Sequence, residues 1–138
     1  MVVFMVPDNN IAMKKIANAI FGTASEVDSE SLTKKIEPML VDGELIVGAF
    51  KLVRDLVVFT DRRLILVDKQ GVTGKKTDYH SVPYRSISQF SIETAGNLDV
   101  DSELKVWIGS SSTPIKKEFR RGTNMVAVQK LLASCVLG

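Results

Sequence analysis

The stretch from Leu56 to Ile92 constrains the fold of this chain most, because its apolar residues come in short runs. The runs Leu56–Phe59 and Leu64–Val67 are joined by only four residues, Thr60 to Arg63. Helices of four or five residues do not persist, whereas β-branched runs of this length between polar links are typical of antiparallel strands. This pattern therefore predicts a mainly β domain.

The same pattern continues on both sides of this stretch and predicts seven strands. In the fifth strand Ile87 is out of phase with Phe90 and Ile92, so a one-residue bulge is needed to place all three on one face. The expected strands are Glu44–Phe50, Val53–Phe59, Leu64–Val67, Thr77–Val82, Ser86–Thr94, the alternating run with Leu104, Val106 and Ile108, and the run with Ile115, Lys117 and Phe119.

Apolar residues at helical spacing predict three helices. The first covers residues 9–21 after the capping residues Asp8 to Asn10, and the second runs from about Ser25 until Pro38 limits it. The third begins after Gly122-Thr123-Asn124, and its apolar stripe contains Met125, Val128, Leu131, Leu132, Cys135 and Val136. We expect this last helix to cover the core at the open end of a bent sheet.

Two motifs carry a family resemblance. A strand ending in Phe59-Thr60-Asp61-Arg62-Arg63 leads directly into a second apolar strand, and the segment Tyr79-His80-Ser81-Val82-Pro83-Tyr84 follows. In these motifs the chain resembles the bacterial pleckstrin-homology-like (PH-like) family, over roughly Gly43 to the C-terminus. The resemblance implies a seven-stranded bent antiparallel sheet, or partly open barrel, capped by the C-terminal helix and here preceded by two N-terminal helices. It also implies cytoplasmic bacterial proteins of uncharacterised role that form homo-oligomers, in ring-like assemblies.

Length and cysteine content agree with one intracellular domain. The 138 residues are enough to bury a core without a metal or a disulfide, and the single cysteine, Cys135, cannot form an internal bridge. The apolar start, Met1 to Val6, is stopped by Pro7-Asp8 and is too short for a signal core or a membrane span. We expect an N-terminal helical extension over residues 1–42, a PH-like domain over residues 43–138, and a cytoplasmic location.

The formal net charge of +2 is unevenly distributed. Residues 1–50 carry four lysines against seven acidic residues, whereas residues 51–85 carry eight basic residues against four aspartates. An acidic flank beside a basic core favours contacts within the chain or between copies of it. The basic excess is too small, and aromatic residues too few among the basic ones, to predict a nucleic-acid partner.

No pattern in the sequence predicts catalysis. His80 is the only histidine, and the sequence places neither a nucleophile nor an orienting group beside it. Cys135 lies on the apolar stripe of the last helix, as a small core residue does. We therefore interpret His80 as a fold-determining or surface residue and predict no catalytic residues and no enzymatic activity.

Metal and nucleotide motifs are incomplete. The acidic run from Asp99 to Glu103 resembles the start of a calcium loop, but Leu104 replaces the required glycine and Ser110 the closing glutamate. The segment Gly71–Lys76 has the wrong spacing for a phosphate-binding loop and joins two strands rather than opening a helix. We interpret it as a hairpin tip with solvated lysines, and we expect no metal and no cofactor.

Two basic segments remain candidates for binding an anionic lipid headgroup or a phosphorylated ligand. Many eukaryotic PH domains bind inositol phosphates through a basic loop between their first two strands, but here that connection, around Lys51–Arg54, is too short. The candidate ligand-binding residues are instead Lys75, Lys76, Lys116, Lys117, Arg120 and Arg121.

The second candidate surface surrounds the motif Thr60-Asp61-Arg62-Arg63. An aspartate at a turn accepts backbone hydrogen bonds and pairs with an arginine, which favours a structural or interface role. Paired arginines at a sheet end also clamp phosphates or a carboxylate of a neighbouring subunit. Tyr79, Tyr84 and Arg85 are assigned to the same surface. The leading hypothesis is a non-enzymatic scaffold module that self-associates and can also bind another protein. The alternative hypothesis is a peripheral binder of anionic lipid headgroups or of a phosphorylated ligand.

Overall fold

The computed structural model describes residues 34–52, 55–70, 76–93 and 101–138. The predicted helix at 9–21 and the beginning of the predicted second helix lie outside these residues. Within the described part, residues 34–36 are helical and continue into the 3₁₀ turn η1 (Glu37–Met39). Pro38 lies in this turn and Leu40 is extended, so the helix ends where the proline predicts.

Four strands form the first antiparallel sheet, in the order β1-β2-β3-β4. Each neighbouring pair is joined by a short connection, as in a β-meander. The strands are β1 (Ile46–Lys51), β2 (Leu56–Thr60), β3 (Arg63–Gln70) and β4 (Lys76–Pro83). They correspond to the first four predicted strands, with boundaries shifted by up to three residues.

Three strands form the second antiparallel sheet, in the order β5-β6-β7. The 3₁₀ turn η2 (Tyr84–Ser86) carries the chain into it from β4. Its strands are β5 (Ile87–Glu93), β6 (Ser102–Ile108) and β7 (Ile115–Phe119). An isolated antiparallel bridge between Leu52 and Phe119 connects the end of the first sheet to the end of the second. The seven predicted strands are thus confirmed, and they are divided between two sheets.

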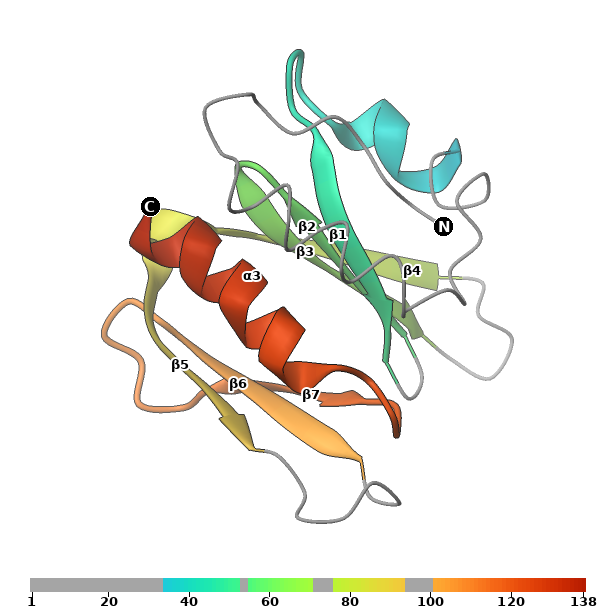
Figure 1. Ribbon diagram of the computed structural model, residues 1–138. Coiled ribbons are helices and arrows are strands. Elements are labelled where there is room, and N and C mark those ends of the chain that lie inside the picture. Colours follow the sequence, from blue (N-terminus) through green and yellow to red (C-terminus); the bar gives the residue numbers. More distant parts are fainter. Residues whose placement is uncertain (1–33, 53–54, 71–75, 94–100) are drawn as a thin grey trace.

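The helix α3 (Met125–Leu137) follows β7 and packs between the sheets (Figure 1). Its N-terminus is capped by Asn124, whose side-chain oxygen accepts a hydrogen bond of 3.1 Å from the backbone N–H of Ala127. This cap satisfies one of the N–H groups that a helix start leaves without a partner. The PH-like architecture expected from the sequence, with a C-terminal helix over the core, is confirmed.

The main core lies between the two sheets and α3. Phe50, Phe59 and Phe119 are fully buried, and Phe50 meets each of the other two rings edge-on, at centroid distances of 5.8 and 6.0 Å. From α3, Val128 and Leu131 complete this cluster with no exposed surface. Edge-on packing of aromatic rings adds to the stabilisation that comes from burying their surface.

A second apolar cluster covers the other face of the first sheet. It consists of Ile36, Ile46, Ala49, Val58, Ile65 and Val67, with Leu40 and Leu56 packed against it. Because β1, β2 and β3 are buried on both faces, their sequences are continuous apolar runs rather than alternating ones. Ile36 and Leu40 belong to the predicted extension 1–42, so the described part of that segment packs directly on the sheet.

The predicted bulge in the fifth strand is confirmed. The register of β5 against β6 shifts between Ile87 and Gln89, which pair with Ile108 and Trp107. Ile87 is buried as a result, and Phe90 and Ile92 pack against the same core. In the described part of the chain, no helix is both long enough and apolar enough to cross a membrane.

Candidate functional site

A buried ion pair lies where the first sheet meets the turn before β1. The Glu44 carboxylate is buried and receives two hydrogen bonds from the Arg63 guanidinium, Nε to Oε2 at 2.9 Å and Nη2 to Oε1 at 3.0 Å. Arg63 also donates to Ser81 Oγ in β4 at 3.0 Å and to the carbonyl oxygen of Met39 at 2.8 Å. One guanidinium therefore joins η1, the start of β3 and the edge strand β4.

Thr60 connects this ion pair to the β2–β3 turn. Its hydroxyl, with no exposed surface, donates to Glu44 Oε2 at 2.6 Å. Thr60 Oγ1 also accepts hydrogen bonds from the backbone N–H groups of Arg62 at 3.1 Å and Arg63 at 2.9 Å. A threonine at the end of a strand thus closes the turn and supports the carboxylate at once.

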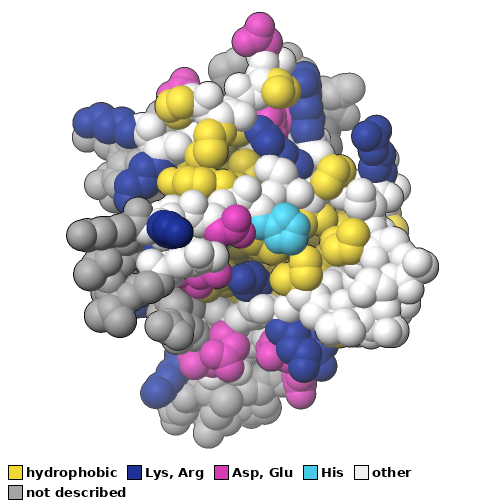
Figure 2. All heavy atoms as spheres, turned by 180° about the vertical axis from the view of Figure 1, so that it is seen from behind, with side chains coloured by type: hydrophobic (Ala, Val, Ile, Leu, Met, Phe, Trp, Pro, Cys, Tyr) yellow, Lys and Arg dark blue, Asp and Glu magenta, His cyan; other side chains and the backbone are white. Residues whose placement is uncertain are grey.

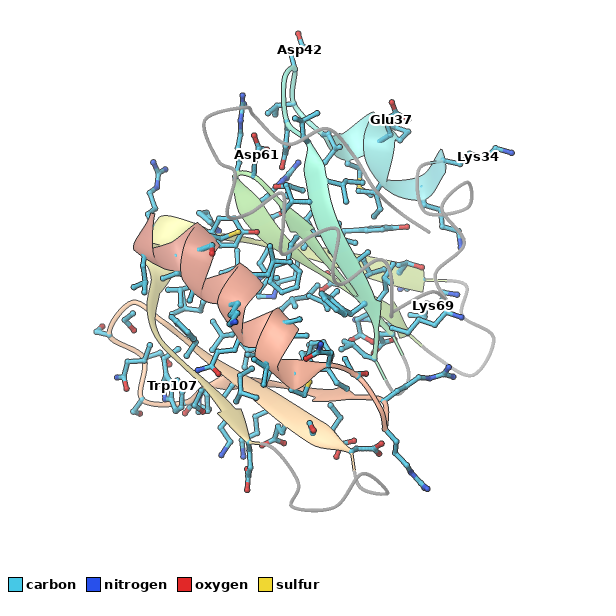
Figure 3. All side chains as sticks on the ribbon, viewed as in Figure 1. Lys34, Glu37, Asp42, Asp61, Lys69 and Trp107 are labelled. Atoms are coloured by element: carbon cyan, nitrogen blue, oxygen red, sulfur yellow. The ribbon has the colours of Figure 1, made fainter. Side chains whose placement is uncertain are left out.

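Asp61 and Tyr84 fix the two sides of the same turn. Asp61 exchanges two hydrogen bonds with Leu45, since its carboxylate accepts from the backbone N–H and its own N–H donates to the carbonyl, both at 2.9 Å. The Tyr84 hydroxyl in η2 donates to the buried carbonyl oxygen of Thr60 at 2.7 Å. Figure 3 labels Asp61 at this end of the sheet, opposite the end where Lys69 is labelled.

Three titrating groups in or beside this network have shifted pKa values. Burial opposes ionisation of Glu44, but hydrogen bonds from Arg63, Thr60 and the Val41 N–H outweigh it and hold the pKa of Glu44 below its ordinary 4.5. Burial raises the pKa of Tyr84 well above 10.0. Burial also raises the pKa of Cys135 to about 11, against a smaller opposite effect of the Tyr84 hydroxyl. Glu44 is therefore charged at neutral pH, and the tyrosine and cysteine are neutral.

The structure divides the predicted motif surface in two. Thr60, Asp61, Arg63 and Tyr84 belong to the network described above, which holds the fold together. The side chains of Arg62, Tyr79 and Arg85 are exposed and make no ion pair within the described residues. These three remain available for contacts with other molecules.

Glu44 was not identified from the sequence as part of this site. It was predicted to be the first residue of a strand, whereas it precedes β1 and accepts four hydrogen bonds, from the Val41 N–H, the Thr60 hydroxyl and twice from Arg63. A signal was present, because an acidic residue directly before a buried apolar run needs a cation or several donors. Its partner Arg63 is nineteen positions away, and no local pattern connects the two.

The basic candidates come from two segments at the other end of the molecule, on either side of the β1–β2 connection. The bridge from Leu52 to Phe119 brings the end of β7 beside the β1–β2 connection. In that connection the Asp55 carboxylate accepts a hydrogen bond of 3.1 Å from the backbone N–H of Lys69, so the end of β3 lies beside the same connection. Exposed cations in the described part of this end are Lys51, Lys69, Lys76, Arg120 and Arg121. Lys75 lies outside the described residues.

Lys116 and Lys117 do not share a face. Lys116 lies opposite Lys105 on the outer face of the second sheet, where Lys105 also forms ion pairs with Glu93 and Glu103. Lys117 lies opposite the buried Leu104 and is half-buried on the inner side. Because neighbouring side chains of a strand point to opposite faces, only one of the two lysines can contact a given ligand.

In the part of the chain that the structure describes, β4 is the edge strand of the first sheet. This strand pairs with β3, and six of its eight residues are exposed, among them Tyr79 and His80. The single histidine lies at the surface of the face seen in Figure 2, with an acidic side chain on one side and hydrophobic side chains on the other. Among the residues that the structure describes, no group of three or more His, Cys, Asp or Glu side chains is placed to hold a metal ion.

This architecture, two antiparallel sheets closed by a C-terminal helix, defines a class of small β domains used mostly to bind other molecules. Residues 15–136 match the bacterial PH domain family, and the chain belongs to that family. The match begins well before Gly43, so the family covers most of the segment assigned to an extension.

Relatives and solved structures agree with this assignment. The chain is 50% identical over 118 residues to the uncharacterised protein YjqA of Bacillus subtilis, which covers 85% of this chain and 94% of YjqA. It is 34% identical over 113 residues to the uncharacterised protein YozO of the same organism, covering 82% of this chain and 93% of YozO.

Two solved structures are similar over most of their length. One is a pleckstrin homology domain from Shewanella amazonensis, with 53% identity, a TM-score of 0.74 and coverage of 88% of this chain and 98% of the other. The second is a protein with a pleckstrin-homology domain from Shewanella loihica, with 47% identity, a TM-score of 0.70 and coverage of 80% and 94%.

Proposed function

We propose that this chain is a non-enzymatic interaction module that self-associates into a homo-oligomer. The observation that carries the proposal is the edge strand β4, which has six exposed residues and, among the described residues, a strand partner on one side only, so that its outward N–H and C=O groups face another strand. Surface residues beside this edge include Tyr79, 37% exposed, and Met39, 36% exposed. Exposed aromatic and apolar side chains next to a free edge favour association.

Charge distribution supports a further contact between copies. The acidic flank over residues 1–50 and the basic core over residues 51–85 are of opposite sign. A head-to-tail contact of these two regions closes into a ring when the rotation between copies permits. Sedimentation velocity of the purified chain at low and high salt tests the proposal. We expect a species heavier than 15.2 kDa that weakens at high salt, and a monomer at both salt concentrations would contradict self-association.

A second function is supported by the position of the basic segments at one end of the molecule. Lys76 and Arg121 lie at this end, on either side of the β1–β2 connection, and cations on one surface attract a phosphate or an anionic headgroup. Cosedimentation with vesicles containing phosphatidylserine tests this function at low salt. Binding that is lost in the double variant Lys76→Glu/Arg121→Glu, and kept in the control Lys34→Glu, would support it. No binding by the wild type would exclude a membrane ligand.

A further inference from the structure

The outer face of the second sheet carries two rows of like charges that run across its strands. In the first row Glu103 on β6 lies directly opposite both Glu93 on β5 and Glu118 on β7. In the second row Lys105 lies directly opposite Lys116. Like charges directly opposite each other destabilise an antiparallel pair, so both rows reduce the stability of the sheet. The register therefore suits the buried face of the sheet and not its outer face.

Ion pairs within the sheet compensate these rows only in part. Lys105 Nζ lies 3.6 Å from Glu93 Oε2 and 3.7 Å from Glu103 Oε1, so one cation serves two carboxylates. Neither Lys116 nor Glu118 forms an ion pair with another residue that the structure describes, and both are exposed. Because these two residues are two positions apart on β7, their side chains point to the same face. This face thus presents one cation and one anion that are free to contact a partner.

A tryptophan forms a third row beside the two charged ones. Trp107 follows Lys105 on the same face of β6, is partly exposed, and lies opposite the exposed Gln89. Figure 3 shows it on the side of the second sheet away from α3. Tryptophan is enriched among the residues that contribute most to the energy of protein–protein interfaces. Along β6 the three rows are about 6.8 Å apart, because an antiparallel strand rises about 3.4 Å per residue.

We propose that this outer face docks a helix of a partner protein that presents a basic, an acidic and an apolar side chain at positions i, i+4 and i+8. These positions share one side of a helix and are about 6 Å apart along its axis, close to the spacing of the rows. With the helix along β6, the basic side chain meets the glutamate row at Glu103. The acidic side chain meets Lys105 and Lys116, and the apolar one covers Trp107.

The width and the charge pattern of the face both favour such a helix. Strands lie about 4.8 Å apart, so the outer two of these three are about 10 Å apart, which matches the diameter of a helix with its side chains. A partner of one sign, such as an anionic membrane or a polyphosphate, would meet repulsion from the glutamate row. A partner with both signs in the matching order pairs with both rows. This inference goes beyond the proposed self-association, because it concerns another surface and another partner.

Exchange of the two unpaired charges tests whether the rows reduce stability. The double variant Lys116→Glu/Glu118→Lys keeps the net charge and places opposite charges across from Lys105 and Glu103. We expect it to unfold at a higher urea concentration than the wild type, because both like-charge pairs between β6 and β7 are removed. A stabilising exchange that abolishes binding is the behaviour of residues kept for an interaction and not for the fold. An unchanged or lower urea midpoint would overturn the argument from the charged rows.

Fluorescence tests the docking itself, because Trp107 is the only tryptophan of the chain and lies in the proposed surface. The probe is a synthetic alanine-based helical peptide of about 20 residues, without tryptophan, that carries Lys, Glu and Leu at positions i, i+4 and i+8. We expect it to change the emission of the wild-type chain in a saturable way. The exchanged variant should bind it roughly tenfold more weakly or worse.

A second peptide with its Lys and Glu exchanged is the matched control, because it has the same composition and net charge. It should also bind the wild type roughly tenfold more weakly or worse. No response to the first peptide, or equal affinity for both peptides, would refute the docking surface. An emission change on raising the concentration of the protein alone would show that a second copy covers this face, and would also refute a partner helix.

Discussion

At the scale of single residues, the two members of the ion pair, Glu44 and Arg63, differ in how far their side chains are exposed to solvent. The Glu44 side chain is 1% exposed and the Arg63 side chain 23% exposed. A buried charge that loses its partner cannot regain water, whereas a half-exposed one can. The two members of the pair should therefore respond differently to removal of the other.

We predict that Arg63→Met destabilises the fold more than Glu44→Gln does. The first change leaves a buried carboxylate without its cation and should cost about 3–5 kcal/mol, while the second leaves an arginine that water can reach and should cost about 1–3 kcal/mol. Urea unfolding of both variants measures the difference. The reverse order would mean that Glu44 is solvated and that the ion pair is not the centre of the network.

The same ion pair predicts how stability depends on pH. Because the pKa of Glu44 is lower in the folded state than its ordinary 4.5, its contribution is fully present above that value and is lost as pH falls through the folded pKa. The free energy of unfolding of the wild type should therefore approach that of Glu44→Gln between pH 5 and pH 2. A constant gap over this range would contradict the assignment.

Burial of Cys135 predicts that its thiol reacts slowly with alkylating reagents. With its pKa raised to about 11, roughly one molecule in a thousand carries the thiolate at pH 8. We expect iodoacetamide to alkylate the native protein far more slowly than the urea-unfolded protein, as intact mass spectrometry would measure. Alkylation at equal rates in both states would show that the core does not bury this thiol in the folded protein.

At the scale of the elements, α3 lies directly against β1 at Gly48. A Cβ atom at this position would lie 2.7 Å from Leu131 Cδ2 in the buried face of the helix. A side chain at this position would force the Leu131 methyl group to shift, and Leu131 is fully buried in the main core. The absence of a side chain at Gly48 therefore helps α3 to pack on the sheet.

We predict that Gly48→Ala destabilises the protein by about 1–3 kcal/mol through overpacking. Leu131→Ala alone should cost about 2–5 kcal/mol because it leaves a cavity. In the double variant the added methyl group occupies part of that cavity, so its cost should be smaller than the sum of the two. Additive costs in urea unfolding would mean that the two positions do not touch.

The elements could be predicted from the sequence where the signal is local. The strands around Phe59 and Leu64 are clear because a sheet buried on both faces gives continuous apolar runs, and the bulge at Ile87 follows from phase alone. What could not be predicted depends on contacts between distant residues. The division into two sheets depends on the bridge from Leu52 to Phe119, and the role of Glu44 depends on Arg63.

The candidate sites followed the same rule. The motif Thr60–Arg63 was found because its residue types suit a turn, but its division into buried and exposed members needed the structure. The basic segments around Lys76 and Arg121 were visible as composition, and only the fold brought them to one end of the molecule. Lys116 and Lys117 are adjacent in sequence, yet the alternation of the strand separates them.

At the scale of the whole molecule, the chain combines a buried core between two sheets with an exposed edge strand, β4. The network around Glu44 and the packing of α3 hold the two sheets together. Among the described residues, the edge strand β4 of the first sheet has a strand partner on one side only. Function is therefore expected at this edge and at the basic end of the molecule, and not in the buried network.

Native mass spectrometry of the purified, untagged chain at micromolar concentration tests the central claim most directly. We expect a discrete species whose mass is a whole-number multiple of 15.2 kDa above one copy, because the proposed contacts join copies of the chain into a closed assembly. A monomer alone would contradict self-association.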